Sequence, residues 1–207
     1  MDKQLHWETI YHEKQPNEVS WTQSNPSLSL KLIQNTQKPK SAKIIDVGGG
    51  ESLLVDYLLD FGFENITILD ISKNALDRCK NRIRNKGKNL KWVVSDITEF
   101  HSETSFEIWH DRAVFHFLTD PTSIAKYKSI LLKSLNPDGE FIIGTFSTDG
   151  PKKCSGLEIK QYTEKSLIES FSPELEPVEF HREDHITPFN TIQNFVFGRF
   201  KMKKIVC

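Results

Sequence analysis

The segment AKIIDVGGGESLLVDYLLD, residues 42–60, constrains the fold of this chain more than any other part of the sequence. A short apolar run contains Asp46, and the glycines Gly48, Gly49 and Gly50 follow before leucines appear at helical spacing. A strand that enters a helix through a glycine-rich turn is typical of α/β sheets, and such a turn commonly binds an anion. Acids stand on both sides of these glycines, and their negative charge would repel an anion. The chemical nature of the ligand that this turn binds therefore has to be decided first.

Apolar runs with strand character alternate with helix-like segments along the middle of the chain. The predicted strands cover residues 43–47, 65–71, 90–97, 105–111 and 139–146. The predicted helices cover residues 51–60, 73–85 and 121–135. Ser72 is expected to cap the second of these helices, and Pro121 is expected in the first turn of the third. This alternation predicts an α/β fold whose five parallel strands carry helices on both faces.

Both ends of the chain show a different pattern. Residues 147–161 are predicted to form a long loop, and residues 163–170 a short helix. Strands at 177–183 and 191–202 are close enough for an antiparallel hairpin, which makes a seven-stranded sheet. Before residue 40 the sequence predicts helices at 5–14 and 27–35, the second with Asn25 as its cap and Pro26 as its first residue.

Composition excludes several classes of function. The formal net charge of the 207 residues is −1, and the basic residues are scattered, so no nucleic-acid partner is expected. No apolar run has membrane-spanning length, and the N-terminus lacks the apolar core of a signal peptide. Cys79, Cys154 and Cys207 lack metal-binding spacing, so we expect no metal site, no disulfide and a cytoplasmic location. No segment resembles a dedicated interface, so a monomer is expected.

The glycine turn satisfies part of the fingerprint of dinucleotide-binding proteins. Gly48 and Gly50 are spaced correctly, and Asp70 follows Gly48 by 22 residues, but Leu53 stands where the third glycine belongs. A pyrophosphate at this turn would also lie close to Asp46 and Glu51, which carry charge of the same sign. These residues therefore disfavour an NAD-dependent oxidoreductase and favour a zwitterionic ligand that carries positive charge.

Residues 40–147 resemble the class I S-adenosylmethionine-dependent methyltransferases, which have a Rossmann-like fold. The segments IIDVGGGES, ILDIS, VVSDI and LNPDGEFII resemble four motifs of that family in the expected order. The last motif departs from the family at Asp138, where a glycine is usual. The resemblance implies that S-adenosyl-L-methionine is the cofactor.

The same resemblance implies roles for individual residues in cofactor binding. Asp46 and the three glycines would lie at the methionine portion of the cofactor. Asp70 would accept hydrogen bonds from both ribose hydroxyls, with Ile71 beside the adenine. Asp96 would accept from the adenine amino group, with Ile97 packed on the ring.

The N-terminal segment resembles the lid of a subgroup of this family. That subgroup includes small bacterial methyltransferases and eukaryotic protein-lysine methyltransferases, among them the citrate synthase lysine methyltransferase. The resemblance implies that Tyr11 faces the cofactor and that Trp21 lies at the reacting centre and contacts the acceptor. The alternative is that Trp7, Tyr11 and Trp21 are helix-packing aromatic residues.

The stretch EIWHDRAVFHFL, residues 107–118, is the most unusual part of the sequence. Related lysine methyltransferases carry an Asp-Lys-Gly-Thr-like segment where this chain has Asp111, Arg112, Ala113 and Val114, so a lysine acceptor is in doubt. Asp111 and Arg112 alternatively form a bidentate ion pair that braces the loop.

Several residues are candidates for contact with the methyl acceptor. His110, Asp111 and His116 are candidates for proton removal, and His110 also for cofactor contact. Arg112 is a candidate for binding an anionic acceptor. The acceptor side further includes Phe115, Cys154 and His185, although packing alone would account for each of them.

The sequence thus predicts one methyltransferase domain, residues 1–207. It consists of a helical lid (1–39), a cofactor-binding core (40–147), and a substrate loop with a C-terminal hairpin (148–207). The acceptor is expected to be a small molecule or a protein side chain with a nitrogen or sulfur nucleophile. The alternatives are a catalytically silent S-adenosylmethionine-binding protein and, less favoured, an NAD-dependent oxidoreductase.

Overall fold

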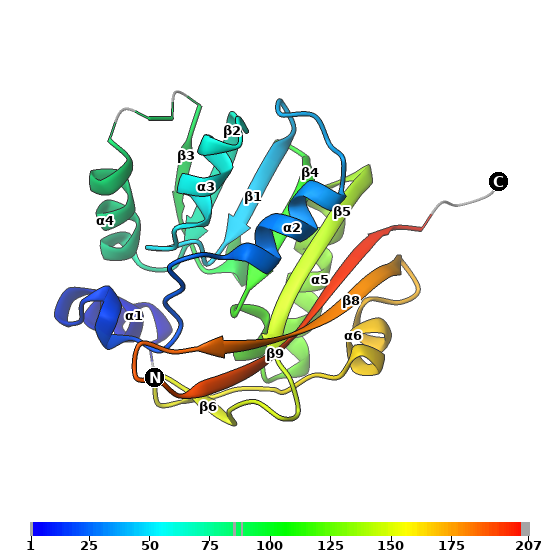
Figure 1. Ribbon diagram of the computed structural model, residues 1–207. Helices are drawn as coiled ribbons and strands as arrows, with labels where there is room; N and C mark the ends of the chain where they lie inside the picture. The colour runs from blue at the N-terminus through cyan, green and yellow to red at the C-terminus, as the bar shows by residue number, and fades with distance from the viewer. Residues whose placement is uncertain (1, 85, 88, 204–207) are drawn as a thin grey trace.

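A computed structural model describes residues 2–84, 86–87 and 89–203, and its centre is a seven-stranded sheet (Figure 1). The strand order is β3-β2-β1-β4-β5-β9-β8. The first five strands in this order are parallel, and β8 and β9 are antiparallel. The strands are β1 (Lys43–Val47), β2 (Asn65–Asp70), β3 (Lys91–Val94), β4 (Phe106–Arg112), β5 (Leu135–Phe146), β8 (Leu175–Ile186) and β9 (Ile192–Met202). The predicted fold class is confirmed.

Helices cover both faces of the sheet. On one face lie α2 (Ser27–Asn35), α3 (Leu54–Asp60) and α4 (Lys73–Ile83), and on the other lie α5 (Pro121–Ser134) and α6 (Glu164–Phe171). Adjacent residues of β1 show the division, because Ile44 packs with the first group of helices and Ile45 with the second. A strand buried on both faces has apolar side chains in succession, which accounts for the sequence KIIDV.

The sheet register brings the acidic ends of the strands together. Asp46 of β1 is paired with Ile68 of β2 and with His110 of β4. Asp70 ends β2 beside Val94 of β3. Because parallel strands end at the same edge of a sheet, these polar residues share one edge.

The helix termini confirm two predicted caps and correct a third. Ser72 Oγ accepts a hydrogen bond from Ala75 N at 3.1 Å, and Pro121 is the first residue of α5. The prediction for α2 was wrong, because Pro26 is the cap residue and the helix begins at Ser27. With ψ of 56°, Pro26 lies outside the helical region, so Asn25 precedes the cap.

The segment after β5 contains a small hairpin where a loop was predicted. Strands β6 (Lys153–Cys154) and β7 (Leu157–Glu158) are joined by Ser155 and Gly156, which have φ of 52° and 78°. Positive φ at both turn positions is the geometry that favours a tight hairpin. Cys154 is thereby held in a short strand.

Helix α1 (Lys3–Glu13) is fixed to the sheet through the start of α4. The carboxylate of Glu8 accepts from Lys73 N at 2.6 Å, from Asn74 N at 3.1 Å and from Ser72 Oγ at 3.0 Å. Backbone N–H groups in the first turn of a helix lack intrahelical partners, so Glu8 supplies them from another helix. Figure 1 shows α1 next to the lower end of α4.

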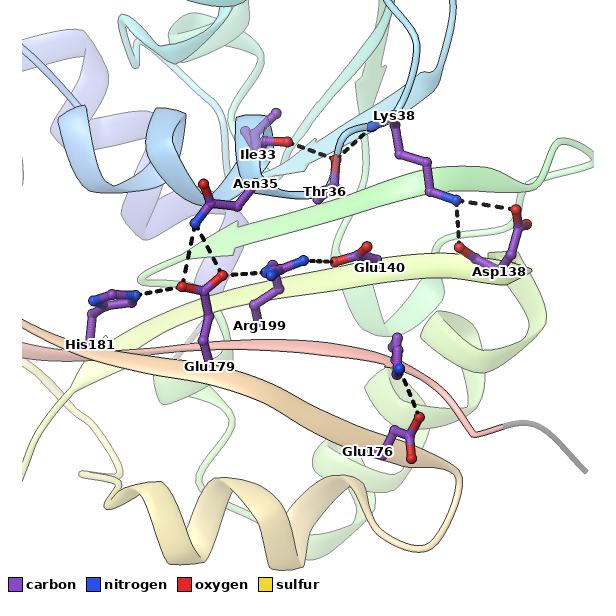
Figure 2. Close-up of polar contacts among 11 residues, drawn as sticks. Ile33, Asn35, Thr36, Lys38, Asp138, Glu140, Glu176, Glu179, His181 and Arg199 are labelled. Carbon is purple, nitrogen blue, oxygen red and sulfur yellow. Dashed lines mark hydrogen bonds and ion pairs between the residues drawn. The ribbon is translucent and has the colours of Figure 1, made fainter.

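A polar network fixes α2 to the C-terminal hairpin (Figure 2). Asn35 Nδ2 donates to Glu179 of β8 at 3.2 Å, and Arg199 Nε of β9 donates to the same carboxylate at 2.6 Å. His181 Nε2 donates to it at 2.7 Å, and Arg199 also donates to Glu140 of β5. Through Glu179 and Arg199, the network therefore joins α2 to β8, β9 and β5.

Across the described ranges, no helix combines the length and apolar character needed to cross a membrane.

Candidate active site

A cavity of about 320 Å³ lies at the carboxyl ends of β1, β2, β3 and β4. Most of the residues predicted to bind cofactor or acceptor line it. They are Tyr11, Trp21, Asp46, Gly48, Gly49, Asp70, Ile71, Asp96, Ile97, His110, Arg112 and Cys154. The remaining predicted residues lie outside this lining: Gly50, Asp111, Phe115, His116 and His185.

The glycine turn has little room for side chains. Gly48 has φ of +68°, and a Cβ there would lie 2.1 Å from Cγ2 of Val114. A Cβ on Gly49 would lie 2.7 Å from Asp46 Oδ2, and one on Gly50 would lie 2.7 Å from Asp70 Oδ2. The sequence attributed the glycines to close approach of a ligand. The structure adds that Val114, in the turn after β4, and the two carboxylates already exclude side chains here.

The two acids that flank the glycines are both paired within the protein. Asp46 is 3% exposed, and its Oδ1 accepts from His110 Nδ1 at 2.7 Å. His110 Nε2 is hydrogen-bonded to Ser29 Oγ of α2 at 2.9 Å. Arg78 Nη1 of α4 lies 3.2 Å from Glu51 Oε2. These partners offset part of the negative charge that the sequence placed at the turn, so its repulsion of a pyrophosphate is weaker than expected.

Asp70 is the carboxylate best placed to bind hydroxyl groups. It ends β2, lines the cavity, and accepts from Ser72 N at 2.8 Å through Oδ1. Burial raises the pKa of Asp70 to about 7, opposed by the hydrogen bond from Ser72 and reinforced by the charges of Asp46 and Glu8. At the end of β3, Asp96 Oδ1 accepts from Thr98 N and Thr98 Oγ1, both at 2.8 Å.

Four aromatic side chains form a group over the cavity, and we call Trp7, Tyr11, Trp21 and Phe117 the aromatic cover. The ring centroid of Trp7 lies 5.5 Å from that of Trp21 and 5.3 Å from that of Phe117. Tyr11 and Trp21 are 6.1 Å apart. Trp7 and Phe117 were not among the predicted binding residues, but both line the cavity. The i, i+4 spacing of Trp7 and Tyr11 on one helix face was the available signal.

Asp111 holds the turn that follows β4. Tyr127 Oη donates to Asp111 Oδ2 at 2.7 Å, and Val114 N donates to Oδ1 at 3.0 Å. Burial raises the pKa of Asp111 to about 6, although these hydrogen bonds act in the opposite direction. The described residues show no Asp111–Arg112 ion pair, so the bidentate brace considered from the sequence does not form.

The side chain of Arg112 has different partners from that of Asp111. Its Nη1 donates to the carbonyl oxygen of Trp21 at 3.1 Å, and its Cζ lies 4.5 Å from the ring centroid of Phe195. Burial lowers the pKa of Arg112 to about 10, which leaves the side chain charged at neutral pH.

Four other acceptor-side candidates lie within packed surroundings. Phe115 is fully buried in the core on the α5 face. His116 stacks on Phe146 and accepts from Phe146 N at 3.3 Å through Nδ1. His185 Nε2 donates to Ser20 O at 2.8 Å. Burial raises the pKa of Cys154 to about 12, so this side chain is a neutral thiol.

Cys207, the third cysteine considered in the sequence, lies outside the described residues.

The open sheet of five parallel strands with antiparallel β8 and β9, and the cavity at its carboxyl edge, have the Rossmann-like arrangement predicted for a class I methyltransferase. The chain belongs to the methyltransferase domain family, which it matches over residues 38–187. The family predicted from the four motifs is confirmed, and the oxidoreductase alternative loses its support.

Three proteins illustrate this similarity. Nodulation protein S of Rhizobium tropici is 32% identical over 82 residues, which cover 40% of this chain and 34% of that protein. Human EEF1A lysine methyltransferase 2 is 25% identical over 142 residues, which cover 63% of this chain and 60% of that protein. The chain therefore spans less than two thirds of either relative.

A solved structure matches the fold over nearly the whole chain. The N-methyltransferase NodS from Bradyrhizobium japonicum WM9, in complex with S-adenosyl-L-homocysteine, has a TM-score of 0.73. The two chains are 15% identical, and the match covers 96% of this chain and 99% of NodS. At this identity the match establishes the shared fold.

Proposed function

We propose that the protein is an S-adenosylmethionine-dependent methyltransferase that acts on a nitrogen or sulfur nucleophile of a small molecule or a protein side chain. The observation that carries the proposal is the cavity in which the glycine turn, Asp70 and Asp96 meet at one sheet edge. Membership in the methyltransferase domain family supports it.

The residues of the cavity fit the cofactor. Asp70 offers a buried carboxylate for two hydroxyls, and Asp96 with Ile71 and Ile97 offers an acceptor and apolar faces for a purine. Asp46, Gly48, Gly49 and Tyr11 line the rest of the cavity and would hold the remaining portion of the cofactor, which carries the positive charge. S-adenosylmethionine, when bound, supplies a methyl group that is carried on a sulfonium sulfur, and this sulfur is a good leaving group.

The protein contributes positioning and exclusion of water. The cavity would hold the acceptor's lone pair in line with the carbon–sulfur bond, whose electron pair would stay on the departing sulfur. A nitrogen acceptor would release its proton to solvent water. Trp21 and the other residues of the aromatic cover would keep water away from this step. His110 lines the cavity, but both of its ring nitrogens are hydrogen-bonded, to Asp46 and to Ser29, so its role is to hold Asp46 in place. Asp111 and His116 are hydrogen-bonded outside the cavity. We therefore propose structural roles for Asp111 and His116.

The nature of the acceptor is suggested by the relatives. One is named as an N-methyltransferase and another as a lysine methyltransferase, which favours a nitrogen acceptor. We further propose that the protein acts as a monomer in the cytoplasm without nucleic acid. Its net charge of −1 and the free, buried thiols of Cys79 and Cys154 support this.

The proposal is tested by binding and by methyl transfer. Titration calorimetry should show binding of S-adenosyl-L-homocysteine and none of NADH. Radiolabelled S-adenosylmethionine incubated with a cell lysate should give labelled product, and size fractionation separates protein from small-molecule acceptors. Binding without transfer in any lysate would identify the silent alternative, and failure to bind S-adenosyl-L-homocysteine would reject the proposed cofactor.

A further inference from the structure

Arg112 ends β4 at the cavity with its guanidinium plane fixed on two sides. Trp21 O accepts from Nη1, and the ring of Phe195 from β9 lies 4.5 Å from Cζ. The contact with Trp21 comes from the segment between α1 and α2, and the contact with Phe195 comes from the sheet. The orientation of the guanidinium is therefore determined by the protein before any acceptor binds.

The two remaining nitrogens of Arg112 have no partner. Nε and Nη2 are buried, and neither has a hydrogen-bond acceptor in the part of the chain that the structure describes. Within the same ranges Arg112 forms no ion pair. Glu183, whose charge acts on Arg112, accepts a hydrogen bond from Gln23 at 3.2 Å. The guanidinium is thus a buried cation without a counter-ion in direct contact.

Such a cation is costly to the fold. Each buried donor left unsatisfied destabilises the folded state, and the penalty is larger when the donor is charged. Buried arginines are normally paired for this reason. Arg112 lines the cavity, and its Nε and Nη2 stay unpaired although this destabilises the fold. This combination indicates that the missing hydrogen-bond acceptor belongs to the ligand.

The geometry of the two free nitrogens identifies the partner. The Nε–H and Nη2–H bonds of a guanidinium point the same way and form the side edge that binds a carboxylate with two parallel hydrogen bonds. Nη1, which is outside this edge, is the nitrogen already used by Trp21. The protein therefore uses only Nη1 as a hydrogen-bond donor and leaves Nε and Nη2, the two nitrogens of the bidentate edge, for a ligand.

The negative charges that act on Arg112 already have other partners. Glu183 and Asp46 both act on its charge, but Glu183 accepts from Gln23 and Asp46 accepts from His110, and neither forms an ion pair with Arg112 in the described part of the chain. Phe146 N donates to His116 Nδ1, so the ring proton of a neutral His116 is on Nε2, which is also buried without a partner. Burial and the charge of Arg112 lower the pKa of His116 to about 3, so the ring is neutral. The free edge of Arg112 therefore has no carboxylate in contact that a ligand anion would have to displace.

We propose that the methyl acceptor carries a carboxylate group and that the Nε–Nη2 edge of Arg112 binds it. This inference rests on the proposed methyl transfer and assigns the acceptor to a chemical class. The carboxylate is the binding group, and the nucleophile is a separate nitrogen or sulfur atom held against the aromatic cover. Because the two nitrogens are buried, neighbouring side chains must shift when the carboxylate binds, while Trp21 O keeps Nη1 in place.

Direct binding of a small carboxylate tests the site. Sodium acetate is titrated into the complex with S-adenosyl-L-homocysteine at constant ionic strength, with sodium chloride as the reference. Saturable acetate binding is expected in the wild type. Arg112→Met should weaken it at least tenfold, and Arg112→Lys, which keeps the charge without the fork, should weaken it as well. Arg182→Met, which removes a surface arginine of β8, is the matched control and should bind acetate like the wild type.

Methyl transfer to matched acceptors gives the second measurement. Glycine and 2-aminoethanol share a primary amine and differ in the carboxylate. The wild type should show at least a tenfold higher kcat/KM for glycine, and Arg112→Lys should lose most of that preference. Absence of saturable acetate binding, equal binding by Arg112→Met, or equal kcat/KM for both amines would overturn the inference.

The two proposals fail in different ways. A protein that binds S-adenosyl-L-homocysteine and labels lysate components but prefers no carboxylate retains the proposed function and loses the acceptor class. A protein that does not bind S-adenosyl-L-homocysteine loses the proposed function itself. Affinity for S-adenosyl-L-homocysteine also shows whether each Arg112 variant is folded. If Arg112→Met is not folded, Arg112→Lys and the wild type decide the result.

Discussion

Single charged residues around the cavity differ in how the protein compensates their charge. Asp46 has His110 as a buried partner, and Arg112 has backbone and ring contacts but no counter-ion in direct contact. Asp70 receives a hydrogen bond from Ser72 N and is otherwise surrounded by like charges from Asp46 and Glu8. Asp70 and Arg112, whose charges are least compensated, are the residues expected to meet ligands.

Asp70→Asn should stabilise the free protein and weaken ligand binding. Because the pKa of Asp70 is raised from 3.8 to about 7, the folded state binds more protons than the unfolded state between these values. Stability from this group is therefore lost as pH rises from about 4 to 7, by up to about 4 kcal/mol. At pH 8 the variant should melt roughly 8–16 °C higher than the wild type, because a chain of this size shifts by about 2–4 °C per kcal/mol.

Binding of S-adenosyl-L-homocysteine should change in the opposite direction. Loss of a carboxylate that accepts two hydroxyl groups should weaken affinity at least about tenfold, since each charged hydrogen bond contributes roughly 1.5–3 kcal/mol. Wild-type affinity should rise with pH through about 7, and Asp70→Asn should lack this rise. Asp77→Asn on the outer surface of α4 is the control. Unchanged affinity in Asp70→Asn would contradict the ribose assignment.

At the scale of elements, a single side chain, Glu8, makes three of the hydrogen bonds that hold helix α1 against α4. Glu8 accepts three hydrogen bonds at the start of α4, and Trp7 and Tyr11 of the same helix line the cavity. A carboxylate that caps a helix typically contributes about 1 kcal/mol. Here the cap also fixes the aromatic side chains above the ligand.

Glu8→Ala should release α1 while leaving the sheet folded. Cleavage by a protease within residues 1–26 should become faster, and affinity for S-adenosyl-L-homocysteine should fall roughly threefold to tenfold because the cap contributes about 1 kcal/mol. Glu13→Ala removes an exposed carboxylate from the same helix and should behave like the wild type. If both variants are cleaved at the wild-type rate, the position of α1 does not depend on Glu8.

Elements with a strong local pattern could be predicted from the sequence, and contacts between distant segments could not. The apolar run of β1 and the cap Ser72 are local signals, and both were correct. The two-residue strand β6 is too short to show a periodic pattern, and the backbone angles of Pro26 overrode the expected cap of α2. Contacts between distant segments were equally unpredictable in the candidate active site.

Motif spacing placed the acids of the cavity correctly, but their partners are remote in sequence. Glu8 acts on α4 more than sixty residues away, and Trp21 holds Arg112 through a backbone carbonyl, a group that every residue possesses. No side-chain pattern can indicate such a contact. For this reason the unpartnered edge of Arg112 became visible only when the fold was known.

At the scale of the whole molecule, Glu179 is a point where several elements meet. Burial raises the pKa of this carboxyl, but hydrogen bonds from His181, Asn35 and Arg199 outweigh that effect and lower the pKa to about 2. The network in Figure 2 therefore stabilises the fold through a carboxylate that must stay ionised.

The stability from Glu179 should be lost in acid. Because its pKa falls from 4.5 to about 2 on folding, the contribution is complete above about pH 5 and disappears as pH falls toward 2. Glu179→Gln should cost roughly 1–3 kcal/mol at pH 7, after allowance for partial exposure, and much less at pH 3. Urea denaturation at several pH values measures this difference. Glu169→Gln, at an exposed position of α6, is the control, and an equal loss at pH 7 and pH 3 would contradict the assignment.

The position of β9 has a consequence for synthesis of the chain. Strand β9 follows β8 in sequence but lies between β5 and β8 in the sheet. A ribosome therefore exposes β5 and β8 before it makes the strand that joins them. The five parallel strands can assemble on the nascent polypeptide, whereas β8 has no neighbour until residues 192–202 emerge. A premature stop codon before residue 192 would thus leave two unpaired strand edges, which are sites for aggregation or chaperone binding.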